Sequence, residues 1–150
     1  GRPFTPGKPG NYTSQYFDDT TGPLFPFGFG LSYTDFSLSD MALSSTTLNK
    51  TGKLDASVMV KNTGKRDGET VVQLYIQDVT GSMIRPVKEL KNFQKIMLKA
   101  GEQKVVRFTI TEDDLKFFNA RLKYAAEPGK FNVQIGLDSQ DVTQQSFELL

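Results

Sequence analysis

The chain has 150 residues, of which 37% are hydrophobic and 23% charged, which fits one globular domain or one domain with an extension. Its 18 basic and 17 acidic residues leave a net charge of +1, so we expect no nucleic-acid partner, and no apolar run approaches the length of about 18 residues that a membrane span needs. The absence of cysteine and histidine excludes disulfides, thiolate metal sites, and Ser-His-Asp or Cys-His catalytic sites within this chain.

Residues 1–34 differ in composition from the rest of the chain. They hold six of the 13 glycines and five of the seven prolines, a density that opposes both helix and central strand. They also hold eight of the 17 aromatic residues, whereas flexible linkers and disordered tails are poor in aromatics. We therefore expect an extended arm that buries its rings on this domain's own sheet or, as we favour, on another domain of a longer protein. The residues assigned to this interdomain packing are Tyr12, Tyr16, Phe17, Phe25, Phe27, Phe29 and Tyr33.

Three of these rings have a regular spacing. Phe25, Phe27 and Phe29 alternate through Pro26 and Gly28, so in an extended chain all three point to one side. Such a row of rings could instead stack on sugar rings, which leaves a free-standing carbohydrate-binding module or a bare interaction domain as alternatives. Packing is favoured because the rings are interleaved with Pro and Gly and do not lie on a rigid strand face.

From residue 35 onward apolar and polar residues alternate, which is typical of half-buried strands. A short stretch near residues 115–118 is expected to form one helical turn, because Thr111 and the three acidic residues after it resemble a helix start. The pattern predicts an all-β fold over residues 35–150, an immunoglobulin-like or fibronectin type III-like sandwich of seven or eight strands. The expected strands are 35–43, 53–62, 69–78, 85–98 (broken by Pro86), 103–111, 131–137 and a short edge strand at 147–149.

The inward face of these strands defines a predicted core. Alternation places one set of apolar residues on the same side of each strand, where two sheets would cover them. This set comprises Val58, Val60, Leu74, Ile76, Phe108, Val133 and Ile135.

Paired carboxylates are the remaining candidates for acid–base chemistry. Asp18-Asp19 and Asp113-Asp114 are adjacent pairs, but neighbours on an extended chain point to opposite faces and so do not form a dyad. Asp113 and Asp114 lie where helix-capping carboxylates belong, and Asp18-Asp19 fits a turn. We therefore assign no catalytic residue, no cofactor or cofactor-binding residue and no metal ligand to this chain.

Three ordered segments carry a resemblance to a known family. They read PLFPFGFGLSY at 23–33, VKNTG followed by DGETVVQLY at 60–64 and 67–75, and RPVKELKNF at 85–93 with Gly-Glu at 101–102. Together they resemble the C-terminal fibronectin type III-like domain of glycoside hydrolase family 3, across essentially the whole chain. The resemblance implies that a retaining glycosidase mechanism, with an Asp nucleophile and a Glu acid/base, lies on two preceding domains, a barrel and an α/β sandwich. Neither catalytic motif occurs here.

The resemblance also implies a role for each part of the chain. Residues 1–34 would be the arm that leaves a preceding catalytic domain, and residues 35–150 a non-catalytic module that packs on and stabilises the catalytic domains. The parent enzyme would be a β-glucosidase that hydrolyses terminal β-D-glucosyl residues, with a periplasmic or secreted location. The chain, which does not begin with Met, would then be an internal fragment or a processed product. A homo-oligomer formed through the arm is a further expectation.

Overall fold

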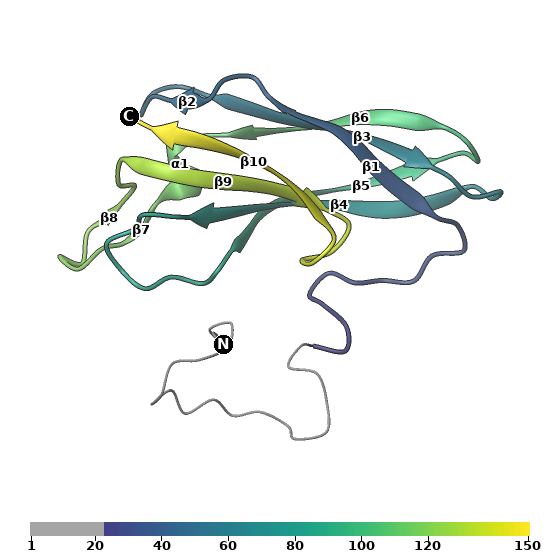
Figure 1. Cartoon of the computed structure of the whole chain (residues 1–150), viewed down its shortest axis with the longest axis horizontal. Helices are drawn as coiled ribbons and strands as arrows, with labels where there is room; N and C mark the ends of the chain where they lie inside the picture. The colour runs from purple at the N-terminus through teal and green to yellow at the C-terminus, as the bar shows by residue number, and fades with distance from the viewer. Residues whose placement is uncertain (1–22) are drawn as a thin grey trace, which may run out of the picture.

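The computed structural model describes residues 23–150, which fold into a sandwich of two β-sheets (Figure 1). One sheet has the strand order β1-β3-β6 and the other the order β2-β10-β9-β4-β5, while β7 and β8 form a separate short pair. All pairings are antiparallel except the one between β2 and β10. The elements are β1 Phe36–Leu43, β2 Thr47–Leu48, β3 Leu54–Asn62, β4 Gly68–Asp78, β5 Glu89–Leu98, β6 Gln103–Ile110, α1 Glu112–Leu115, β7 Phe117–Phe118, β8 Tyr124–Ala125, β9 Gly129–Gly136 and β10 Val142–Leu149.

The core lies between the two sheets and confirms the predicted alternation. In β3 every second residue is fully buried, and the first three of these, Leu54, Ala56 and Val58, stand opposite the buried Ile110, Phe108 and Val106 of β6. The seven predicted core residues, Val58, Val60, Leu74, Ile76, Phe108, Val133 and Ile135, are all buried. The prediction of an all-β, fibronectin type III-like sandwich is therefore confirmed.

The helical turn lies three residues earlier than predicted. Thr111 is its N-cap, and the backbone N–H of Thr111 donates a hydrogen bond of 2.7 Å to Oδ2 of Asp114. The turn spans Glu112–Leu115 because the helix begins directly after its capping residue. The capping role expected for this acidic pair is confirmed for Asp114, whereas Asp18-Asp19 lies outside the described residues.

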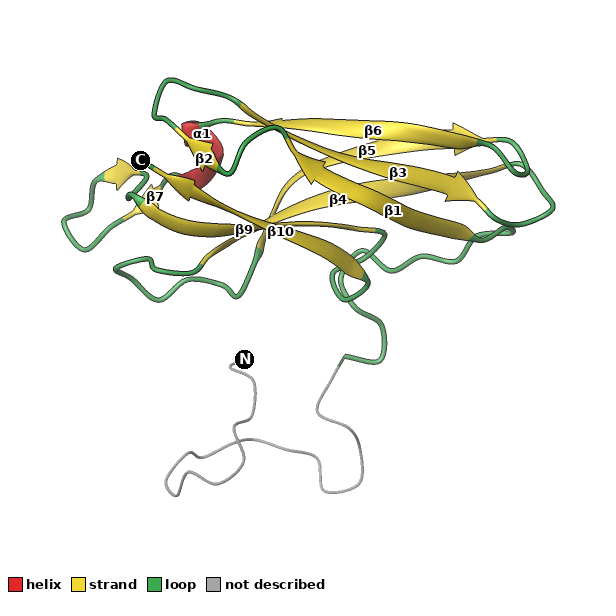
Figure 2. Ribbon diagram, turned by 45° about the horizontal axis from the view of Figure 1, so that its top comes forward, coloured by secondary structure: helices red, strands yellow, loops and turns green. Residues whose placement is uncertain are grey.

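The last strand was predicted incorrectly as a short edge strand at 147–149. β10 has eight residues and lies between β9 and the two-residue strand β2 (Figure 2). Its first half carries no apolar alternation, so it is defined by backbone pairing with β9, from Val142 opposite Gly136 to Leu149 opposite Gly129. The predicted strand at 85–98 begins only at Glu89, and the residues before it form a loop. Within residues 23–150, no helix is long and apolar enough to cross a membrane.

Candidate docking site on segment 23–34

The predicted packing residues that the structure describes lie at the surface. Phe25, Phe27, Phe29 and Tyr33 are 63%, 66%, 44% and 91% exposed, and the neighbouring Leu24 and Leu31 are more exposed than any of the three phenylalanines. Tyr12, Tyr16 and Phe17 lie outside the described residues. Segment 23–34, which precedes β1 and runs along one side of the sandwich (Figures 1 and 2), therefore presents a cluster of uncovered apolar side chains.

A tight turn shapes the tip of this segment. The N–H of Phe29 donates a 3.1 Å hydrogen bond to the carbonyl oxygen of Pro26, and Gly28 has a φ of +81°. A type II turn requires a positive φ at its third residue, which glycine adopts without steric cost. The turn brings the rings of Phe25 and Phe29 into a stack with centroids 5.1 Å apart. The prediction that Phe25, Phe27 and Phe29 alternate along an extended chain is therefore wrong for residues 26–29.

Gln73 of β4 anchors this turn to the five-stranded sheet. Its side chain is buried, and its Nε2 donates to the carbonyl oxygens of Gly28, at 3.2 Å, and Leu137, at 2.7 Å. Its Oε1 accepts a 2.5 Å hydrogen bond from the hydroxyl of Tyr75. Each polar atom of the amide thus has a partner, as a buried amide requires, and the Gly28 carbonyl is fixed in space.

The loop after β9 supplies a second anchor. The N–H of Ser139 donates a 2.9 Å hydrogen bond to the carbonyl oxygen of Phe27, and the carbonyl oxygen of Ser139 accepts one of 2.5 Å from Nζ of Lys88. Burial lowers the pKa of Lys88, an effect that the nearby carboxylate of Asp138 opposes. Burial, with a smaller contribution from Asp138, raises the pKa of Tyr75, so this residue stays a hydroxyl that can donate to Gln73.

Asn62 fixes the other end of the segment. This residue is fully buried, and its Oδ1 accepts a 2.7 Å hydrogen bond from the hydroxyl of Thr34. Its Nδ2 donates to the carbonyl oxygens of Arg66, at 2.8 Å, and Leu98, at 3.1 Å. A side chain at position 64 would overlap Thr34, which explains the glycine there. The segment is therefore tied to the sandwich at the turn and at its last residue, Thr34.

A groove of about 420 Å³ lies between the segment and the sandwich. It contains four carboxylates and no basic residue. No group of three or more His, Cys, Asp or Glu residues that could hold a metal ion occurs within residues 23–150. The lining residues come from three places: segment 28–36, the start of β4 at 69–71, and the loop residues Leu137, Asp138 and Asp141.

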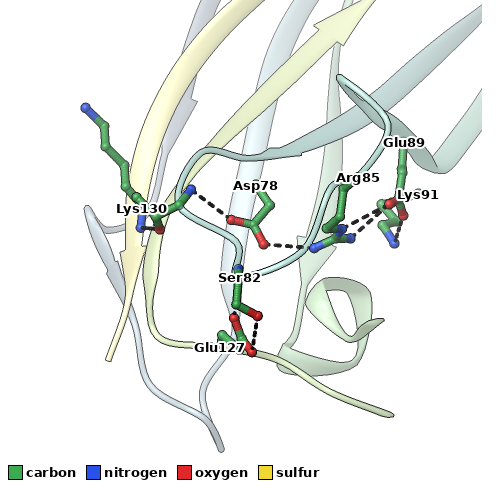
Figure 3. Close-up of polar contacts among 8 residues, drawn as sticks. Asp78, Ser82, Arg85, Glu89, Lys91, Glu127 and Lys130 are labelled. Carbon is green, nitrogen blue, oxygen red and sulfur yellow. Dashed lines mark hydrogen bonds and ion pairs between the residues drawn. The ribbon is translucent and has the colours of Figure 1, made fainter. Parts of the chain in front are cut away.

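A second polar cluster lies at the other end of β4, around its last residue, Asp78 (Figure 3). Nη1 of Arg85 lies 2.9 Å from a carboxylate oxygen of Asp78, and its Nη2 lies 2.9 Å from Glu89. Glu89 is also paired with Lys91 at 2.7 Å. Burial opposes ionisation of Glu89, but hydrogen bonds from Lys91 and Arg85 outweigh it and lower the pKa of this carboxyl. The cluster holds the loop between β4 and β5 against β5.

Comparison with known proteins identifies the sandwich. The model of the family described as "Fibronectin type III-like domain" matches residues 70–139. The periplasmic β-glucosidase of Salmonella typhimurium is 63% identical over 150 residues, which is all of this chain and 20% of that protein. The β-glucosidase BoGH3A of Bacteroides ovatus is 50% identical over 121 residues, or 80% of this chain and 16% of that protein. The chain carries the fibronectin type III-like domain of glycoside hydrolase family 3.

A solved structure shows the same module in a larger enzyme. The crystal structure of a β-glucosidase from Listeria innocua in complex with glucose matches with a TM-score of 0.86 and 43% identity. The match covers 99% of this chain and 21% of the Listeria chain. The chain thus spans about one fifth of these relatives, and the resemblance stated from the three sequence segments is confirmed.

Several residues that shape the docking site were missed by sequence reasoning. Gln73, Lys88 and Ser139 fix the turn, yet none was assigned a role. Gln73 stands in the alternating run of β4, where a polar residue at an outward position normally faces water. The one available signal was that this glutamine interrupts an otherwise apolar stretch, Val71 to Ile76.

We expect Gly28→Ala to release the turn from the fibronectin type III-like module. An alanine at a φ of +81° costs about 1–2 kcal/mol, and its Cβ would overlap the side-chain amide of Gln73. Hydrogen exchange at the amides of Phe29 and Ser139, followed by NMR, should therefore accelerate. Gly30→Ala is the matched control, since a Cβ at position 30 meets nothing within 4 Å. Equal exchange rates in the two variants would contradict the role given to Gly28.

Proposed function

We propose that this module is the non-catalytic C-terminal part of a β-glucosidase, with residues 1–34 joining it to preceding catalytic domains. In this proposal segment 23–34 packs on those domains and stabilises them. The observation that carries the proposal is that four aromatic side chains are exposed on a segment that is tied to the sandwich at its turn and at Thr34. Large exposed apolar patches mark interaction sites in soluble proteins.

The energetics favour packing of this segment on a partner. An aromatic side chain can remove 150–250 Å² from water when it is buried. The turn at 26–29 is already fixed by Gln73 and Ser139, so docking would order few additional backbone bonds. Pre-organisation of this kind lowers the entropic cost of association.

The activity of the parent protein is inferred from its relatives. The Salmonella, Bacteroides and Listeria proteins are named as β-glucosidases, and the first as periplasmic. We infer that the parent of this module hydrolyses terminal β-D-glucosyl residues in the periplasm or outside the cell. The acid–base and nucleophilic carboxylates would lie on the preceding domains, and none is assigned to residues of this module.

Truncation of the tip rings tests the packing role. In the full-length enzyme, Phe27→Ala and Phe29→Ala should each lower the midpoint of thermal unfolding, because truncating an interface aromatic typically costs about 1–4 kcal/mol. In the 150-residue chain alone, Phe27→Ala should stay within about 0.5 kcal/mol because this ring is 66% exposed, whereas Phe29→Ala should cost about 0.5–1.5 kcal/mol because it removes the stack with Phe25. Val105→Ala, on the outer face of β6 in the other sheet, is the control and should change neither protein. Unchanged stability of both full-length ring variants would contradict the proposal.

The alternative function is that of a carbohydrate-binding module, which the exposed aromatic rings also suit. It predicts that titration of the 150-residue chain with cello-oligosaccharides gives a saturable change in NMR shifts. A saturable response that Phe29→Ala abolishes would replace the packing role with sugar binding. Self-association through the arm is a separate possibility, which sedimentation at several protein concentrations would reveal.

A further inference from the structure

In the loop between β4 and β5 the aliphatic side chains face solvent and the charged side chains face the protein. Within residues 79–88, Val79, Met83, Ile84 and Val87 are 48%, 44%, 84% and 57% exposed. In soluble proteins the charged residues of a surface loop normally face water, and a row of aliphatic residues turned outward is unusual.

The charged residues of this stretch are turned inward. The side chains of Arg85 and Asp78 are 11% and 3% exposed and form the ion pair of Figure 3. The guanidinium of Arg85 also lies 4.5 Å from the centroid of the Phe117 ring. Lys88 is half-buried and donates to the carbonyl oxygen of Ser139. The inward charges and outward aliphatic residues therefore belong to one ordered arrangement.

The adjacent β7–β8 hairpin also carries exposed apolar side chains. The rings of Phe118 and Tyr124 lie 5.1 Å apart, and both side chains are exposed, as is Leu122 between them in the chain. Ser82 of the loop makes two hydrogen bonds, of 3.1 and 2.8 Å, to the carboxylate of Glu127, which follows the hairpin. We call this surface the end patch; it comprises Val79, Met83, Ile84, Val87, Phe118, Leu122 and Tyr124.

We propose that the end patch is a second docking surface, and that its occupant is the remainder of the same polypeptide. The inference rests on the proposed function, because it assigns the same partner to a second part of the module. The loop that carries the patch is held by Arg85, Ser82 and Lys88, so its aliphatic side chains are presented in a fixed geometry.

The position of the patch favours the remainder of the polypeptide, and not a second copy of the chain, as its occupant. In both views the β4–β5 loop and segment 23–34 extend from the same side of the five-stranded sheet (Figures 1 and 2). The chain enters the module through that segment, so covalent linkage gives the preceding part of the polypeptide a high effective concentration on this side. The chain spans only 20% of its Salmonella relative, so that partner is large enough to reach both surfaces.

Hydrogen exchange compared between the 150-residue chain and the full-length enzyme tests the inference. The amides of residues 83–85, 87 and 88 should exchange about tenfold more slowly, or slower still, in the full-length enzyme. The double variant Ile84→Ser with Val87→Ser should abolish that protection and lower the thermal midpoint of the full-length enzyme. The same variant should leave the stability of the 150-residue chain unchanged, and Val105→Ser is the control with no effect on either protein.

The outcomes separate this inference from the proposed function. Protection of segment 23–34 without protection of residues 83–88 would overturn the end patch and leave the proposed function in place. Protection of neither region would overturn both. If residues 83–88 become protected in the 150-residue chain as its concentration rises, the patch binds a second copy of the chain and the inference is overturned. A loss of stability in the 150-residue double variant would also overturn it, because the two side chains would then support the module itself.

Discussion

Truncation of Ile135 to alanine should lower the free energy of unfolding of this chain by about 2–5 kcal/mol. Ile135 is fully buried in β9, where it pairs with Leu74 of β4, and the loss combines transfer of its methyl groups with the cavity left behind. Ile76→Ala should have a similar effect. Denaturant unfolding followed by circular dichroism measures both changes, and Val105→Ala, whose side chain is partly exposed, should stay within about 0.5 kcal/mol. Unchanged stability of either isoleucine variant would contradict the strand register described here.

Replacement of Arg85 by methionine should be about as damaging, at about 3 kcal/mol. The change removes the partner of Asp78, whose side chain is only 3% exposed, and leaves a buried carboxylate without its counter-charge. Removing both charges, as Arg85→Met with Asp78→Asn, should cost less than Arg85→Met alone, because no unpaired charge then remains. A double variant that is less stable than the single one would show that Asp78 acts mainly through its other contact, the 3.1 Å hydrogen bond that its Oδ1 accepts from the N–H of Thr80, and not through the ion pair.

The loss of stability expected for Arg85→Met should depend on pH, because Glu89 belongs to the same cluster. The pKa of Glu89 is lowered in the folded state by its hydrogen bonds to Lys91 and Arg85, which outweigh the opposing effect of burial. A carboxyl with a lowered folded-state pKa stabilises the fold above its unfolded-state pKa, and this stabilisation is lost as the pH falls through the folded-state value. The stability difference between the wild-type chain and Arg85→Met should therefore shrink in acid, below about pH 4. A difference that is constant with pH would argue against a contribution from Glu89.

The sandwich was largely predictable from the sequence because its strands alternate. From Leu54 to Val60 in β3 and from Phe131 to Ile135 in β9 every second residue is apolar and faces the core, so periodicity alone located both strands. The first half of β10 lacks this alternation, and the two-residue strands β2, β7 and β8 are too short to show any, so only backbone pairing reveals them.

The docking site was predictable only in part. The aromatic residues of segment 23–34 were visible from composition, but the turn at 26–29 depends on Gln73 and Ser139, which are distant in sequence. The end patch was hidden for a different reason. The residues Val79 to Val87 contain apolar side chains that sequence patterns ordinarily assign to a core, and only the structure shows that Arg85 is buried in their place.

The hydrogen bonds that hold the turn at 26–29 also determine when this turn can form during protein synthesis. The turn at 26–29 leaves the ribosome before Gln73, which holds the Gly28 carbonyl and follows 45 residues later, and before Ser139, which follows later still. The tip can be fixed only after β4 and β9 have emerged and paired, and such distant contacts form slowly. Domains generally fold as units, the N-terminal ones first, as the chain emerges. Preceding domains would thus complete their own folding before the rings of segment 23–34 reach their final geometry, and docking would be the closing step of assembly.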